Sequence, residues 1–126
     1  MLCLYIGIAG SRTITDYNTL LAGIDAAVAA KVITPAHSYE LVSGGAKGVD
    51  SLARRYAIER GLKLTELKPQ YQHNNDRGAP LRRNHDIAAA SDVLLAIWDG
   101  QSTGTAHMIN CMKQLGKPCY IHRVNQ

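Results

Sequence analysis

Residues 41–50 have the sequence LVSGGAKGVD, in which an apolar segment runs directly into a turn of small residues. The same arrangement occurs at residues 4–12, LYIGIAGSR, and at residues 93–105, VLLAIWDGQSTGT. In a parallel α/β sheet, turns of this kind meet at the carboxyl edge, where ligands bind. Small residues there let backbone N–H groups approach an anion at the start of the following helix. The three turns together predict a ligand that carries phosphate, and we expect a nucleotide.

The rest of the chain alternates between strand and helix patterns. We expect strands at residues 2–9, 39–43, 62–67, 92–98 and 118–124, and helices at residues 16–31, 49–60, 81–90 and 105–115. Such alternation is typical of a parallel sheet with helices on both faces. The predicted fold class is therefore α/β, a single Rossmann-like three-layer domain over residues 1–126 with a five-stranded, mostly parallel sheet.

Two local features refine this pattern. Asp16 begins the first helix, where a negative charge favours the positive end of the helix dipole, and Gly61 follows the second helix as a natural C-cap. Residues 70–80 are polar and form the longest stretch without periodicity. Two interpretations of this stretch stay open: a loop that covers the ligand, or a solvated connection.

Composition and charge limit the classes of protein. The 126 residues carry a formal net charge of +4, which suits an anionic partner. The three cysteines have no C-x-x-C spacing, so we expect reduced, mostly buried thiols of a cytoplasmic protein and neither a disulfide framework nor a zinc site. No segment is typical of a signal peptide or of a membrane span, so we expect no membrane partner.

The turn at residues 43–50 is the strongest local signal. Gly44 and Gly45 allow positive φ and close backbone approach, beside the start of a helix. The turn has neither the P-loop spacing nor the G-x-G-x-x-G fingerprint, which removes the usual support for ATP hydrolysis and NAD chemistry. Asp50 has three open interpretations: stabilisation of the helix start, a hydrogen bond to a ribose hydroxyl, or a contact to the neighbouring loop. We expect Lys47 to face solvent more than phosphate.

The other two turns, and the helix before the fourth strand, add polar groups at the same edge. Hydroxyl groups in residues 102–105 stand beside a helix start, where they cradle phosphate or cap the helix. An arginine at the start of the third predicted helix offers a fork that matches phosphate oxygens. The candidate ligand-binding residues are Gly10, Ser11, Arg12, Ser43, Gly44, Gly45, Lys47, Asp50, Arg83, Asn84, Asp99, Gly100, Ser102, Thr103, Gly104 and Thr105.

Catalytic chemistry has few candidates. Asp99 and His107 are the residues that we single out for a catalytic role, as an acidic group and as a general acid or base. Neither His107 nor His85 has a partner at metal-ligand spacing in the sequence, so we expect no metal site and no cofactor.

The motifs, in their order and combination, resemble the SLOG superfamily, a Rossmann-like group that includes cytokinin-activating phosphoribohydrolases and the DNA-processing protein of bacterial transformation. Within it, the chain is similar to a small bacterial and phage branch of nucleotide binders. The resemblance rests on residues 10–12, 43–50, 83–84 and 98–105 and covers nearly the whole chain. It implies a nucleotide-type ligand at the carboxyl edge, with its phosphate near residues 44–45 and 104–105.

The resemblance also separates the possible activities. In the phosphoribohydrolases a turn like residues 99–105 is followed closely by a catalytic glutamate, whereas this chain has Ala106, His107 and Met108 there and no glutamate after Glu66. N-glycosidic hydrolysis needs an acidic group at an oxocarbenium-like centre or on the attacking water. This departure favours binding without turnover, while Arg83 matches the arginine on the preceding helix.

The sequence is therefore compatible with three functions. The leading hypothesis is a sensor or sequestering protein for a nucleotide or a nucleotide-derived signalling molecule. The second is a phosphoribohydrolase-like N-glycosidase that acts on nucleoside monophosphates, with Asp99 or Asp50 in the acidic role. The third is single-stranded nucleic-acid binding through Arg54, Arg55, Arg82 and Arg83, although no basic and aromatic series supports base stacking. We also expect a homo-oligomer, for which the alanine-rich helix at residues 22–30 offers a surface.

Overall fold

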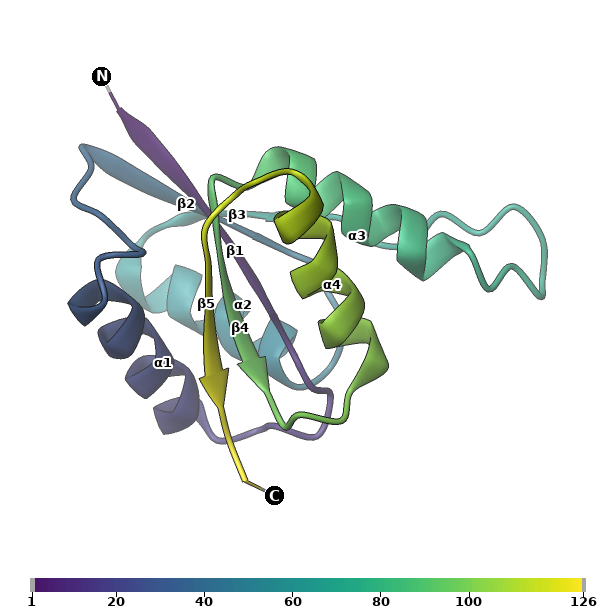
Figure 1. Cartoon of the computed structure of the whole chain (residues 1–126), viewed down its shortest axis with the longest axis horizontal. Helices are drawn as coiled ribbons and strands as arrows, with labels where there is room; N and C mark the ends of the chain where they lie inside the picture. Colours follow the sequence, from purple (N-terminus) through teal and green to yellow (C-terminus); the bar gives the residue numbers. More distant parts are fainter. Residues whose placement is uncertain (1, 126) are drawn as a thin grey trace.

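The computed structural model describes residues 2–125. Its strands are β1 (Cys3–Gly10), β2 (Ser38–Ser43), β3 (Lys63–Glu66), β4 (Val93–Trp98) and β5 (Cys119–Arg123) (Figure 1). Its helices are α1 (Tyr17–Ala29), α2 (Val49–Arg60), α3 (Ala79–Ala90) and α4 (Thr103–Gln114). Strands and helices alternate along the chain, as the sequence pattern predicts.

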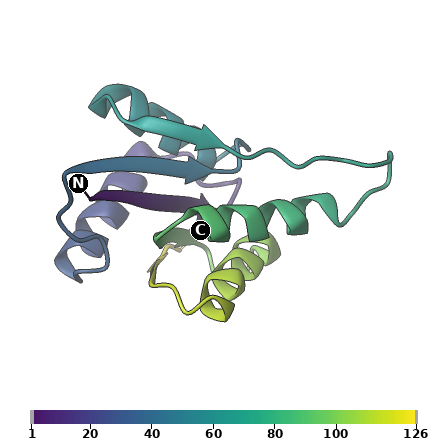
Figure 2. The ribbon, with the colours of Figure 1, turned by 90° about the horizontal axis from the view of Figure 1, so that it is seen from above.

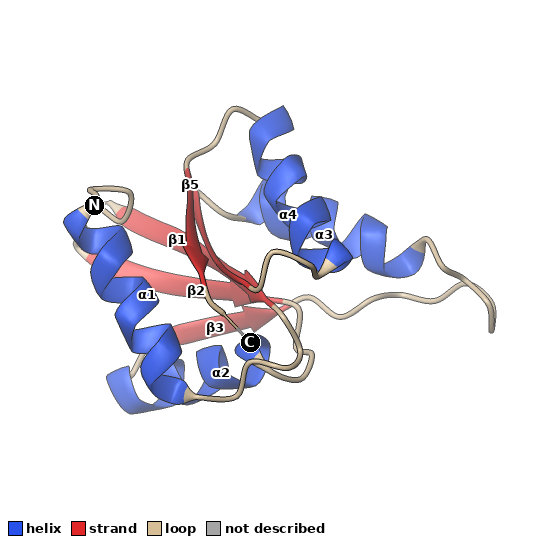
Figure 3. Cartoon of the chain, turned by 60° about the horizontal axis from the view of Figure 1, so that its bottom comes forward, coloured by secondary structure: helices blue, strands red, loops and turns tan. Residues whose placement is uncertain are grey.

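The strands form one sheet in the order β3-β2-β1-β4-β5, and every neighbouring pair is parallel. The chain leaves β1 toward β2 and β3, then crosses over to β4 and β5, so the strand order reverses between β1 and β4. Helices α1 and α2 cover one face of the sheet, and α3 and α4 cover the other (Figure 3). The predicted Rossmann-like α/β fold is confirmed, with an entirely parallel sheet.

The core has two parts, one on each face of the sheet. Alternate side chains of β4 explain this division: Leu95 and Ile97 pack toward α1 and α2, whereas Leu94 and Ala96 pack toward α3 and α4. All four are fully buried. A strand buried on both faces must be apolar at every position, and this requirement accounts for the unbroken apolar sequence of β4.

The helix ends follow local rules, and two helix starts lie two residues earlier than predicted. Asp16 caps α1 by accepting a hydrogen bond from the Asn18 amide, and Gly61 ends α2 at a φ of 65°. Helix α4 begins two residues earlier than predicted because Ser102 acts as its N-cap. Helix α3 begins at Ala79 because Pro80 fits the first turn of a helix, where no backbone N–H is needed.

The segment between β3 and α3 projects from the body of the protein (Figures 1 and 2). Asp76 organises its distal part, because this buried carboxylate accepts hydrogen bonds from the Gln72 and Gly78 amides and pairs with Arg82. The hydrogen bond to Arg82 is the main reason why the pKa of Asp76 lies below its usual value. The distal part of the segment is therefore a turn held by hydrogen bonds, and not only a solvated connection.

Candidate functional site

Three loops meet closely at the carboxyl edge of β1, β2 and β4. The Ser11 amide donates to Ile97 O at 3.3 Å, and Ser11 O accepts from the Val49 amide at 3.4 Å. Gly48 has a φ of 73°, and a Cβ atom there would lie 2.5 Å from the backbone of Arg12. The loop after β1 thus packs directly on the loop after β2, and only glycine fits at the contact.

Beside this junction lies a cavity of about 290 Å³. Its walls come from the ends of β1 and β2 and from the starts of α2, α3 and α4. Nine of the predicted ligand-binding residues line it: Gly10, Arg12, Gly44, Asp50, Arg83, Asn84, Ser102, Gly104 and Thr105. The switch between β1 and β4 is where ligands bind in open parallel sheets, so the cavity occupies the expected place.

Arg83 reaches across the cavity from α3 to the turn after β2. Its Nη1 donates to Gly44 O at 3.0 Å and lies 3.5 Å from Leu67 O, while its Nε donates to Asn84 Oδ1 at 3.1 Å. A Cβ atom on Gly44 would lie 2.4 Å from Nη1, so Gly44 leaves room for the guanidinium. Within residues 2–125 the Nη2 group has no hydrogen-bond partner, and it can donate to a ligand.

Asp50 brings a negative charge into the same cavity. It is buried, and its Oδ2 accepts from the Ala46 amide at 3.0 Å, which holds the turn after β2. Burial raises the pKa of Asp50, while the Ala46 hydrogen bond and the nearby Arg83 charge oppose that rise. This contact lies within the turn at residues 43–50, to which Asp50 itself belongs. An ionised carboxylate only accepts hydrogen bonds and repels phosphate, so Asp50 suits sugar hydroxyls.

The start of α4 suits an anion better than the surroundings of the Asp50 carboxylate do. The Ser102 hydroxyl caps the Thr105 amide, and Ser102 O accepts from the Ala106 amide. In the part of the chain that the structure describes, the Thr103 and Gly104 amides have no partner. Free amides at a helix start bind anions, and the buried Thr105 lies beside them.

The other predicted ligand-binding residues lie outside the cavity lining. They are Ser11, Ser43, Gly45, Lys47, Asp99, Gly100 and Thr103. Ser43 is fully buried, and its hydroxyl has no partner among residues 2–125. Lys47 is exposed in a neighbouring depression that also contains Arg12. Gly100 has a φ of 82° and packs against Arg123, so its conformation is set by the turn.

Asp99 folds back on the loop that it begins. Its Oδ1 accepts from the Ser102 and Gln101 amides, both at 2.8 Å. These hydrogen bonds, that of Ser102 above all, hold the pKa of Asp99 below its usual value. The side chain is occupied in capping and does not line the cavity. An acidic role for Asp99 on a ligand in this cavity has no support from its geometry.

The capping role of Asp99 predicts a pH-dependent effect on stability. Because its pKa is lowered on folding, Asp99 stabilises the fold above the unfolded pKa of about 3.9, and this contribution is lost as the pH falls through the folded pKa. We expect Asp99→Asn to be destabilised at pH 6, with a difference from wild type that shrinks in acid. Urea unfolding between pH 2 and 7 measures this, with the exposed Asp25→Asn as the control. A constant difference at every pH would contradict the prediction.

The apolar part of the lining was missed by reasoning from sequence. It consists of Ile8, Ala9, Ala46, Pro80, Leu81, Ile87 and Met108. In the sequence these residues are indistinguishable from the rest of the core, because lining a cavity requires the same residue types as packing against a neighbour. Pro80 and Leu81 lie just after the projecting segment, of which residues 70–78 contribute nothing to the lining.

His107 lies behind the cavity on α4. Its Nδ1 is 3.0 Å from Asn84 Nδ2, and its ring packs edge-on against His85 of α3 at a centroid distance of 5.4 Å. Burial, followed by the neighbouring His85, lowers the pKa of His107. The expectation that neither histidine has a partner at metal-ligand spacing is wrong, because Cys111 lies one helical turn after His107 and faces the same neighbours.

Taken together, these observations define a Rossmann-like protein with a cavity at the switch point of a parallel sheet. The family model of the YspA, cpYpsA-related SLOG family matches residues 6–73. The chain belongs to this family, and the resemblance to the SLOG superfamily is confirmed. A relative, the Gene 61 protein of Mycobacterium phage D29, is 31% identical over 115 residues, which are 87% of this chain and 86% of that protein.

Solved structures show the same fold. DNA processing protein A from Helicobacter pylori, described for its single-stranded DNA binding mode, matches 94% of this chain with a TM-score of 0.68 and 25% identity. DNA processing protein A from Streptococcus pneumoniae matches 94% of the chain with a TM-score of 0.66 and 15% identity, and supports the fold alone. The chain spans 64% and 50% of these two structures, respectively. None of the helices in residues 2–125 has the length and apolar character to cross a bilayer.

Proposed function

We propose that the cavity binds a nucleotide or a nucleotide-derived signalling molecule, and that residues 1–126 act as one nucleotide-binding domain that senses or sequesters it. The observation that carries this proposal is the composition of one cavity. The unpaired amides at the start of α4 and the free Nη2 of Arg83 suit phosphate, Asp50 suits sugar hydroxyls, and Ile87 and Met108 offer an apolar wall for a base.

The size of the cavity supports a small ligand. Its volume of about 290 Å³ is just below the range of roughly 300–1,000 Å³ that is typical of ligand pockets. The free cysteines Cys3, Cys111 and Cys119 suit a reducing compartment, which supports a cytoplasmic location.

The first experiment identifies the ligand. The purified protein is denatured, and any released nucleotide is identified by mass spectrometry. The refolded or ligand-free protein is then titrated with the common nucleoside mono-, di- and triphosphates by calorimetry. Saturable binding with one site per chain, lost in a variant of Arg83, is the expected result. Absence of binding to every nucleotide tested would contradict the proposal.

Single-stranded nucleic acid is the second candidate ligand, and a specific observation favours it. Two further depressions adjoin the cavity: one contains Arg12, Lys47 and Arg54, and the other contains Lys68 and Arg82. These side chains could follow a phosphate backbone on both sides of a nucleotide in the cavity. The similarity to the Helicobacter pylori protein supports this alternative. Arg54 and Arg82 each pair with a carboxylate, of Glu66 and Asp76 respectively. Arg55 pairs with Glu59, stacks on Tyr17 and lies in neither depression.

Salt and strand length separate the two ligands. Affinity for a nucleic-acid strand falls steeply between about 50 and 200 mM salt and rises with the number of phosphates contacted. Affinity for a free nucleotide changes little with salt and does not depend on strand length. Fluorescence anisotropy with a mononucleotide and with thymidylate strands of about 5 and 15 residues distinguishes them. Arg54→Ala weakens only strand binding, because Arg54 lies outside the central cavity.

We expect no appreciable release of base from nucleoside monophosphates. The residues after Thr105 supply no carboxylate, and Asp99 is occupied in capping its loop. Asp50 remains the acidic group in the cavity, where it already accepts the Ala46 amide. Chromatography of reaction mixtures measures free base. Release that disappears in Asp50→Asn, in a protein that still folds, would make the N-glycosidase function the better one.

A homo-oligomer remains a prediction. On α1 the side chains of Ala22, Val28 and Ala29 are exposed, and that of Val28 is 51% exposed. Small apolar side chains allow two helices to approach closely. Light scattering coupled to gel filtration measures the mass, and Val28→Glu should shift an oligomer toward the monomer. A monomer at every concentration would contradict the prediction.

A further inference from the structure

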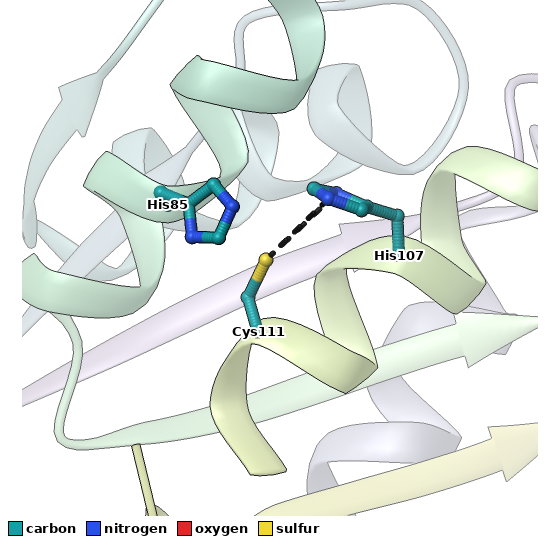
Figure 4. A group of neighbouring side chains, drawn as sticks. All are labelled: His85, His107 and Cys111. Atoms are coloured by element: carbon teal, nitrogen blue, oxygen red, sulfur yellow. Dashed lines mark hydrogen bonds between the residues drawn. The ribbon is translucent and has the colours of Figure 1, made fainter. Parts of the chain in front are cut away.

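Helices α3 and α4 bring three metal-ligating side chains together behind the cavity. His85 comes from α3, and His107 and Cys111 come from α4 (Figure 4). One ligand atom from each residue lies within 4.8 Å of the other two. Cys111 Sγ is 3.8 Å from Nδ1 of His107 and 3.9 Å from its Nε2. None of these residues takes part in the lining of the cavity.

We propose that His85, His107 and Cys111 bind one transition-metal ion, with Zn²⁺ as the first choice. Two imidazoles and one thiolate form a donor set that favours Zn²⁺ or another borderline or soft ion over Mg²⁺ and Ca²⁺, which prefer oxygen. Three protein ligands leave the fourth tetrahedral position to water or to an incoming ligand.

The distances fit this coordination. A tetrahedral zinc with a Zn–S bond of about 2.3 Å and Zn–N bonds of about 2.0–2.1 Å places sulfur and nitrogen about 3.5 Å apart. The observed 3.8 Å between Cys111 Sγ and His107 Nδ1 is close to this value. His85 is exposed, so its ring can turn toward the other two ligands without disturbing the core.

The surroundings also suit a metal ion. Cys111 is only 2% exposed, His107 is half-buried and His85 is exposed, so the group is closed on the protein side and open to solvent at His85. Asn84 Nδ2 lies 3.0 Å from His107 Nδ1 and 3.4 Å from Gly104 O. An ion bound at Nδ1 would take the place of the hydrogen bond from Asn84 to the ring, while the amide keeps its contacts with Gly104 O and with Arg83 Nε.

Cobalt substitution tests the proposal with a readout of the ligands themselves. The protein, stripped of metal under reducing conditions, is titrated with Co²⁺. We expect one ion per chain, visible absorption of a tetrahedral site and a near-ultraviolet band from thiolate-to-cobalt charge transfer. Zn²⁺ should displace Co²⁺ stoichiometrically. Competition with a chromogenic chelator gives the Zn²⁺ affinity.

Variants decide whether these three residues are the ligands. Since loss of an outer-shell partner already lowers metal affinity about 10–100-fold, we expect His85→Ala and Cys111→Ser to lower Zn²⁺ affinity at least 100-fold. Cys111→Ser should also abolish the charge-transfer band. The matched controls are His73→Ala in the projecting segment and Cys119→Ser in β5, which should bind as wild type does.

Two results would overturn the proposal. One is wild-type protein that binds Co²⁺ without a thiolate band, which indicates adventitious binding to surface histidines. The other is unchanged stoichiometry and affinity in His85→Ala. Because His85 is exposed, this variant is expected to fold, and circular dichroism verifies that it does. The result therefore stays decisive even if Cys111→Ser is destabilised by the change in the core.

Discussion

Gly48→Ala is expected to destabilise the protein by about 3–5 kcal/mol, the largest effect on folding that we predict from a single methyl group. Two costs add at this position. The backbone has a φ of 73° and a ψ of −127°, a conformation that alanine rarely adopts. The new Cβ atom would also lie 2.5 Å from Arg12 C and O, and backbone atoms cannot move aside as a flexible side chain can.

A second glycine separates these two costs. Gly61 has a φ of 65°, but a Cβ atom there meets nothing within 4 Å. Gly61→Ala should therefore show only the conformational cost of about 1–2 kcal/mol. Chemical denaturation of both variants measures the difference. If Gly48→Ala is no less stable than Gly61→Ala, the two loops are not packed against each other as described, and the junction beside the cavity must be revised.

Arg83→Ala is expected to weaken nucleotide binding by about 2–4 kcal/mol, roughly 30- to 1,000-fold in Kd. The guanidinium is held by Gly44 O and by the Asn84 side chain, so its free Nη2 group is oriented before a ligand arrives. Orientation in advance removes much of the entropy cost of binding. Calorimetric titration with the nucleotide identified by mass spectrometry measures the loss.

Arg82 provides the control for charge. It neighbours Arg83 in sequence but lies outside the central cavity, where it pairs with Asp76. Arg82→Ala removes the same charge and should leave nucleotide affinity within about threefold of wild type, because Arg82 does not line the cavity and an exposed charge outside a site is screened by salt. Arg83→Lys should restore only part of the affinity, since a lysine cannot reproduce the fork of donors. Equal losses in Arg82→Ala and Arg83→Ala would indicate general electrostatic attraction and not a site contact.

The fold was predictable because each element carries its own signal. Helix α2 begins at Val49 and ends at Arg60, as predicted, since Gly61 provides a clear stop. The starts of α3 and α4 were less well predicted. Pro80 and Ser102 both belong to the first turn or cap of a helix, yet proline and serine are also common in loops.

The candidate site was predictable only in part, since the sequence shows which residues are near the edge but not where a side chain turns. Arg83, Asn84 and Thr105 do line the cavity, whereas Asp99 turns back to cap its own loop. The group formed by His85, His107 and Cys111 was missed. The spacing of four between His107 and Cys111 is visible in the sequence, but the approach of His85 depends on how α3 packs against α4.

The lining of the cavity comes from both sides of the crossover between β1 and β4. Gly10, Arg12, Gly44 and Asp50 belong to the first half of the sheet, and Arg83 and Ser102 belong to the second. A molecule bound there would contact both halves of the sheet and hold them together. The unfolding temperature would therefore rise as the concentration of this molecule increases. Hydrogen exchange would then slow on both sides of the crossover at once, including amides far from any contact with the ligand.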